Sequence, residues 1–166
     1  KLSFTFCSLL KTIKIPANSK LEIIENDAFN LSSIVIISIP SSLTHIGPYA
    51  FASCRNLTTI EIPLDSKLEI IDDKAFCDTK ITKIFIPSHL KRIGDRAFYQ
   101  CFSLSQIDIA DDSELQIIDS HAFTNTPITH FKMPLHVTHI GIGVFDHCSQ
   151  FKRIEFPPDF KLQMIS

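Results

Sequence analysis

The sequence lacks the features that several common classes of protein require. Its 16 basic and 18 acidic residues give a net charge of −2, whereas nucleic-acid and anionic-membrane partners usually require a basic excess. We therefore expect no nucleic-acid partner. No apolar run approaches the roughly 18 residues that indicate a membrane span, so we also expect no membrane insertion in this segment.

Sequence motifs that carry catalysis are missing as well. The patterns His-Glu-x-x-His, Cys-x-x-Cys and Gly-x-Ser-x-Gly do not occur, and the four glycines form no phosphate-binding loop. The paired carboxylates Asp72-Asp73 and Asp111-Asp112 lie in turn segments, where acidic side chains are more often solvated than catalytic. We expect no enzymatic activity, no bound metal and no cofactor.

The sequence is rich in internal repetition instead. A pair that ends in phenylalanine recurs along the whole chain, and its spacing alternates between 25 and 22 residues, so that two coils make one 47-residue unit. This spacing is typical of leucine-rich repeats. The pairs are Ser3-Phe4, Ala28-Phe29, Ala50-Phe51, Ala75-Phe76, Ala97-Phe98, Ala122-Phe123 and Val144-Phe145.

Each repeat predicts one short strand that ends at a proline. The segment Ile60-Glu61-Ile62 alternates apolar and polar residues, which indicates a strand with one buried face. Proline has no N–H group and therefore ends the pairing of a strand with its neighbour. We expect one long parallel sheet, built from the strands before Pro16, Pro40, Pro63, Pro87, Ala110, Pro134 and Pro157.

The return segment of each coil predicts a second short extended piece, as in residues 43–46. The next position is Gly or an acidic residue, for example Gly47 or Asp72, and we expect a tight turn with positive φ there. The residues around each phenylalanine, such as 50–54, predict a single helical turn that fills the core.

Together these elements predict a mainly-β, right-handed solenoid of about seven coils over residues 1–166. A single coil cannot bury its own Ile, Leu and Phe side chains, so stability must come from stacking equal columns on neighbouring coils. The first residue is not Met, and both ends fall inside a repeat. We therefore expect the chain to be a fragment of a longer repeat array.

The repeat pattern resembles that of the BspA-like leucine-rich repeats. Residues 57–63 read Leu-Thr-Thr-Ile-Glu-Ile-Pro, and residues 43–54 run from Leu-Thr-His-Ile-Gly to Ala-Phe-Ala-Ser-Cys. That family comprises surface-associated proteins of anaerobic bacteria and parasitic protists, implicated in adhesion to host cells and to matrix proteins such as fibronectin. The resemblance thus implies a cell-surface or secreted location and a protein ligand. In a eukaryotic secreted chain, Asn30 and Asn56 would be candidate sites of N-glycosylation, because each begins an Asn-x-Ser/Thr triplet.

The outward positions of the strands form the candidate binding face. Stacked at the strand spacing, they make a mixed polar face roughly 30 Å long. Exposed apolar residues on such a face indicate a contact site, although β propensity alone also accounts for them. Adhesion through this face and a passive role as a spacer both remain open. The candidate residues are Val35, Ile36, Glu61, Lys83, Phe85, Asp108, His130, Lys132, Arg153 and Glu155.

The five cysteines predict free thiols. Four of them lie 47 residues apart, at Cys7, Cys54, Cys101 and Cys148, and are therefore two coils apart. That separation is roughly 9–10 Å at the strand spacing, beyond the roughly 7 Å between Cα atoms that a disulfide tolerates. Cys77 lies in another column, where pairing with Cys54 or Cys101 on an adjacent coil stays open. A buried free cysteine acts as a small apolar side chain.

Overall fold

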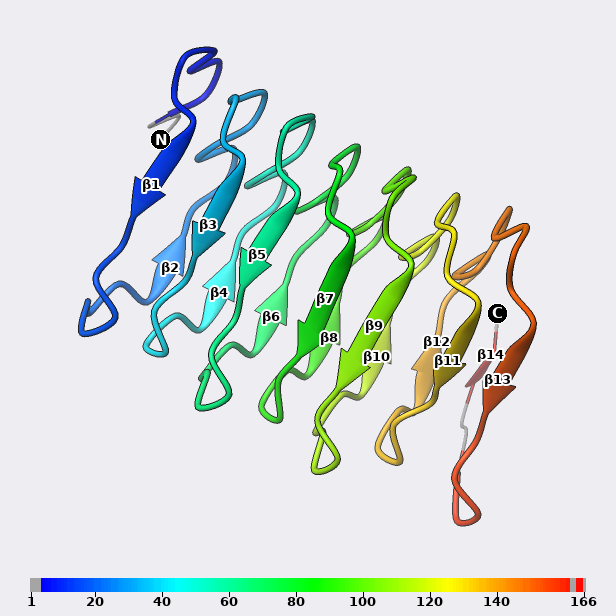
Figure 1. The fold of residues 1–166 in the computed structure, drawn as a ribbon. Helices are drawn as coiled ribbons and strands as arrows, with labels where there is room; N and C mark the ends of the chain where they lie inside the picture. Colours follow the sequence, from blue (N-terminus) through cyan, green and yellow to red (C-terminus); the bar gives the residue numbers. More distant parts are fainter. Residues whose placement is uncertain (1–3, 162–163, 166) are drawn as a thin grey trace.

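The computed structural model describes residues 4–161 and 164–165 and confirms the mainly-β parallel solenoid. The chain descends along the front strands, returns behind them and advances from left to right, which makes the coil right-handed (Figure 1). The front strands are β1 (Thr12–Lys14), β3 (Ile36–Ser38), β5 (Thr59–Glu61), β7 (Lys83–Ile86), β9 (Gln106–Ile109), β11 (His130–Lys132) and β13 (Arg153–Glu155).

The return segments of the coils form a second, continuous sheet. Its seven strands are all parallel and pair only with the next coil on either side. This sheet confirms the second extended piece that the sequence predicts. The strands are β2 (Ile23–Ile24), β4 (His45–Ile46), β6 (Ile70–Ile71), β8 (Arg92–Ile93), β10 (Ile117–Ile118), β12 (His139–Ile140) and β14 (Met164–Ile165).

The front strands do not form the single long sheet that we expected. They divide into β1-β3-β5, β7-β9 and β11-β13. Proline follows most of these strands and removes a donor from the ladder. On the return side, the residue after each strand from β4 to β12 still donates to the preceding coil, as from Gly94 N to Ile71 O at 2.8 Å. At the position where Ala110 replaces proline, its N–H bonds Ile86 O at 3.0 Å and lengthens the pairing of β7 with β9.

The helical turn expected around each phenylalanine is also wrong. The described part of the chain forms turns there and no helix. From Phe29 to Phe145, each turn contains two residues of positive φ, one two residues before Phe and one two residues after it, as at Lys74 (54°) and Asp78 (57°). A right-handed helix requires negative φ, so the chain follows a tighter reversal.

In the short coils, a glycine follows the return strand, and it is required for a reason other than the one we predicted. Gly47, Gly94 and Gly141 are not among the residues of positive φ. Their coils approach the preceding coil too closely for a side chain. A Cβ atom on Gly94 would lie 2.5 Å from Asp73 Oδ1 and 2.6 Å from the carbonyl carbon of Asp72.

The core is a column of stacked phenylalanine rings. Successive rings lie 5.2 to 5.9 Å apart between centroids, with planes within 8° of parallel. Offset stacking of aromatic rings adds to the free energy of burial. At the C-terminal end, Phe145 also stacks on Phe151, and Phe131 meets it at a tilt. The column is Phe4, Phe29, Phe51, Phe76, Phe98, Phe123 and Phe145.

A second core column alternates thiol and hydroxyl groups. Cys101 Sγ donates to Phe76 O at 3.1 Å and lies 3.3 Å from Thr79 Oγ1. The pairs Ser32–Cys54 and Thr126–Cys148 repeat this arrangement. All five cysteines, Cys77 included, are free thiols in the structure.

We predict that Phe76→Ala lowers the free energy of unfolding by about 3–5 kcal/mol, because it removes a fully buried ring and leaves a cavity. Denaturant unfolding followed by circular dichroism measures the change. The control is Phe102→Ala, which removes a ring that is 64% exposed and should change stability by about half a kcal/mol at most. Equal losses for both variants would refute the stacked column as the main source of stability.

We also predict that the thiols differ in reactivity. Only the thiolate reacts, and burial raises the pKa of half-buried Cys77. Cys54 and Cys101 are fully buried, and burial raises the pKa of Cys54 and raises that of Cys101 to about 12. In the folded protein, a maleimide should label half-buried Cys7 and Cys77 well before these two. Mass spectrometry after unfolding without reductant should find five labelled sites. Rapid labelling of Cys101 in the folded protein would contradict the burial of this column of thiol and hydroxyl groups.

Candidate binding face

The outward strand positions align in two columns along the front of the solenoid. Strand register places Thr12 beside Ile36 and Thr59, then Lys83 beside Gln106 and His130 beside Arg153. The second column runs through Lys14, Ser38, Glu61, Phe85, Asp108, Lys132 and Glu155. We call these two columns the strand face.

The strand face includes nine of the ten residues that the sequence singled out. Val35 is the exception, because it precedes β3 and is half-buried. It still lines a shallow hollow of about 720 Å³ together with Ile36, Thr12 and Lys14. Side chains alternate between the two sides of a strand, so two consecutive residues cannot both project outward.

Apolar and charged groups are interspersed on the strand face. Ile36 is 45% exposed, and Phe85 is half-buried beside Asp108 of the next coil. Glu61 accepts a hydrogen bond from Ser38, and Arg153 pairs with Glu155 on the same strand. Lys132 reaches back to Asp111 at 3.2 Å. The face therefore offers a wide mixed surface for contact with a protein.

The described residues offer no site for a metal ion. They contain no group of three or more His, Cys, Asp or Glu side chains that could hold a metal ion. The described residues also contain no helix that is long and apolar enough to cross a bilayer.

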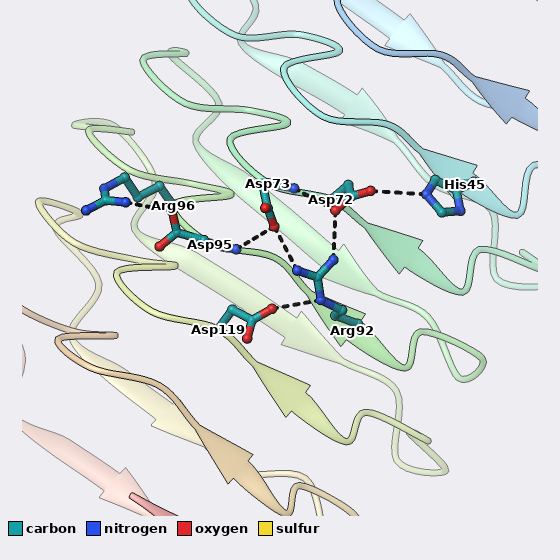
Figure 2. Close-up of polar contacts among 7 residues, drawn as sticks. All are labelled: His45, Asp72, Asp73, Arg92, Asp95, Arg96 and Asp119. Carbon is teal, nitrogen blue, oxygen red and sulfur yellow. Dashed lines mark hydrogen bonds and ion pairs between the residues drawn. The ribbon is translucent and has the colours of Figure 1, made fainter. Parts of the chain in front are cut away.

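The opposite face contains an ion network that the sequence analysis missed. Arg92 on β8 binds three carboxylates, at 2.7 Å to Asp72, 2.8 Å to Asp73 and 2.7 Å to Asp119. Figure 2 shows the guanidinium between the coils before and after its own, with His45 3.3 Å from the far side of Asp72. The Asp72-Asp73 pair that we expected to be solvated is thus largely engaged by one arginine.

The network shifts the pKa of Asp72 and that of Arg92. Burial alone would raise the pKa of Asp72, but hydrogen bonds from Arg92, the Asp73 N–H group and His45 lower it below its ordinary value. Burial opposes the charge of Arg92, yet the carboxylates of Asp72, Asp119 and Asp73 raise its pKa. Both directions favour the charged forms of Asp72 and Arg92, and the ion pairs of Arg92 join three neighbouring coils.

The 47-residue period could have revealed this network. His45, Arg92 and His139 fall at one position of the short coils, and Asp72 and Asp119 fall at one position of the long coils. The bases and acids therefore alternate along the return sheet. Only the stacking of the coils places them within hydrogen-bonding distance.

The fold agrees with comparisons with known proteins. A model of the BspA type leucine rich repeat region, in six copies, matches residues 1–84 and 69–166, so the chain belongs to that family. No match is found among the curated proteins.

Solved structures show the same solenoid. The pneumococcal vaccine antigen PcpA superposes with a TM-score of 0.78 at 25% identity, over 83% of this chain and 36% of that one. The leucine rich repeat protein of T. pallidum gives 0.74 at 28% identity, over 81% and 62%. A leucine rich cell surface protein from Faecalibacterium prausnitzii gives 0.57 at 25% identity, over 93% and 56%. The chain thus covers from about a third to three fifths of these proteins.

We predict that Asp72 stabilises the fold above its ordinary pKa of about 3.9 and that this stabilisation is lost as the pH falls below that value. The sign follows from a lowered pKa, because the unfolded chain takes up the proton first. Between about pH 6 and pH 3, the melting temperature of Asp72→Asn should fall less than that of the wild type. The control is Asp65→Asn, at an exposed aspartate on the loop after β5. A wild-type pH profile in Asp72→Asn would exclude this contribution.

Proposed function

We propose that this chain is a non-enzymatic module that binds a protein through its strand face. It would act as part of a surface-exposed or secreted protein that adheres to host or matrix proteins. The observation that carries the proposal is the contrast between two sides of the same strands. The inward positions of the strands are Ile in every coil from β1 to β9, whereas the outward columns change from Thr to Ile to Lys with no period.

Packing accounts for the inward columns and leaves the outward columns free. Ile37, Ile60 and Ile84 are buried at one strand position and belong to the same core cluster, so close packing restricts their size and shape. Ile36 lies one residue away and is 45% exposed. An apolar side chain there contributes little to the core and is available to a partner.

The family and the solved relatives support a surface role. The relatives include a protein described as a vaccine antigen and another described as a cell surface protein. Both are longer than this chain, so their remaining parts are not represented here. We carry over only the expectation that such solenoids present a surface to other proteins.

A passive spacer is the second candidate. Coil follows coil at a nearly constant separation, as the ring spacings of 5.2 to 5.9 Å show, and such a stack extends a protein along one axis. A spacer tolerates charge reversal on its strand face, whereas an adhesive surface does not. One pair of variants therefore separates the two functions.

We predict that Lys83→Asp with Phe85→Asp weakens adhesion to immobilised matrix proteins such as fibronectin, or to host cells, by tenfold or more, about 1.4 kcal/mol. The reason is that both side chains lie on the strand face within one β strand. Thermal melts check that the variant is folded, because Lys83 is exposed but Phe85 is half-buried, and its replacement can cost more than the half a kcal/mol or so that is usual at an exposed site.

The matched control makes the same chemical change away from the strand face. Leu64→Asp with Lys67→Asp replaces an apolar residue that is 84% exposed and an exposed lysine in the loop after β5. This variant should adhere like the wild type. If the folded strand-face variant also adheres like the wild type, this part of the face is not the binding site. The spacer function, or another face, then becomes the better account.

A further inference from the structure

A small cavity lies beside the strand face, where the loops after β9, β11 and β13 meet. Its volume is about 170 Å³, well below the 300–1,000 Å³ of typical sites for drug-sized ligands. It is large enough for one amino-acid side chain. The lining includes Ala110, Asp111, Asp112, Met133, Leu135 and Pro157. We call it the β11 pocket.

The alternation of coil length explains why a hollow forms at this position. From the proline position to the next buried Leu or Val, long coils have two more residues than short coils, as in 110–115 against 134–137. The short loop after β11 therefore lies between two longer loops. Leu135 and His136 form its exposed tip, between Asp111-Asp112 on one side and Pro157 on the other.

Side-chain differences distinguish the β11 pocket from the equivalent places beside β3 and β7. There the preceding long loop begins with Pro16 or Pro63, whereas the β11 pocket has the smaller Ala110. The tips of the short loops begin with Ser41 and Ser88, whereas the β11 pocket has Leu135, which is 47% exposed. The pocket thus combines more space with an apolar wall.

The rim of the pocket is acidic. Asp112 is exposed and is anchored by a hydrogen bond of 2.5 Å that Ser88 Oγ donates to its Oδ1. Asp111 is 95% exposed at its side chain and pairs with Lys132 at 3.2 Å. Exposed ion pairs of this kind contribute little to stability, so a cation that forms two hydrogen bonds to a carboxylate can displace Lys132. Two carboxylates above an apolar wall match a side chain with an alkyl stem and a charged planar end.

We infer that the β11 pocket binds an arginine side chain of the protein partner. The stem packs on Ala110, Leu135 and Pro157, which are half-buried or exposed in the lining, and the guanidinium meets the carboxylates of Asp111 and Asp112. The inference rests on the proposed protein-binding function and adds a chemical requirement to it. Lys132 belongs to the strand face and also lines the pocket, so one partner can occupy both.

The test is an NMR titration of the ¹⁵N-labelled chain with the capped tripeptide acetyl-Gly-Arg-Gly-amide. The expected result is a saturable shift of the amide signals of residues 110–113 and 135–136. The same tripeptide with norleucine or glutamate at the centre should bind at least about tenfold more weakly, because it lacks the charge or reverses it. Equal binding of either peptide would overturn the assignment of arginine.

Two variants locate the site. Ala110→Leu fills the cavity and Asp112→Asn removes one charge, and each should weaken binding of the arginine peptide about tenfold. Asp65→Asn is the control, because Asp65 has the same place in the loop after β5 that Asp112 has after β9. Should Ala110→Leu fail to fold, Asp112→Asn decides. Shifts that spread to the loop around Asp65, or unchanged binding by Asp112→Asn, would refute the pocket.

The result is distinguishable from the outcome for the strand face. The Lys83 and Phe85 double variant leaves the pocket intact and should bind the arginine peptide within about twofold of the wild type. If that peptide binds while the double variant still adheres to matrix proteins, the strand face fails and the pocket stands. If adhesion is lost in the double variant and the peptide does not bind, the pocket fails and the strand face stands.

Discussion

Each coil of this solenoid places one phenylalanine ring face to face with the ring of the next coil, and the separation of these rings sets the separation of the backbones. At this distance the return strands form hydrogen bonds from coil to coil without interruption. The same separation leaves no room for a side chain where Gly94 meets Asp72 and Asp73. The stacked rings, the continuous ladder and the glycine positions therefore depend on one another, because all three require the same close approach.

Stacking also separates stability from recognition. A residue such as Ile84 is buried in the core that neighbouring coils share, so its replacement affects more than its own coil. Its neighbour Lys83 projects to solvent on the same strand. Because side chains alternate along a strand, a few residues serve both purposes with little interference. A repeat protein can consequently change its ligand while its core columns remain the same.

The pairing of long and short coils adds order beyond a simple repeat. Thiols alternate with hydroxyls in the core at Thr79 and Cys101, and acids alternate with bases on the return sheet at Asp72 and Arg92. Each partner lies in the opposite type of coil, so neighbouring coils are complementary rather than identical. Loops of two lengths alternate as well, and the hollow beside Leu135 follows from that difference.

The sequence by itself determined the coil, its period, the strand before each proline and most of the strand face. The reason is that residues which recur every 22 or 25 positions pack against the equivalent residues of the neighbouring coils. It did not determine the turns, since the positive φ of Lys74 and Asp78 follows from closing the coil at a fixed separation. Nor did it reveal the Arg92 network or the pocket at Ala110. Those depend on side chains about 20 residues apart in sequence that only stacking brings within 3 Å of each other, and on loop lengths that matter only when neighbouring coils lie side by side.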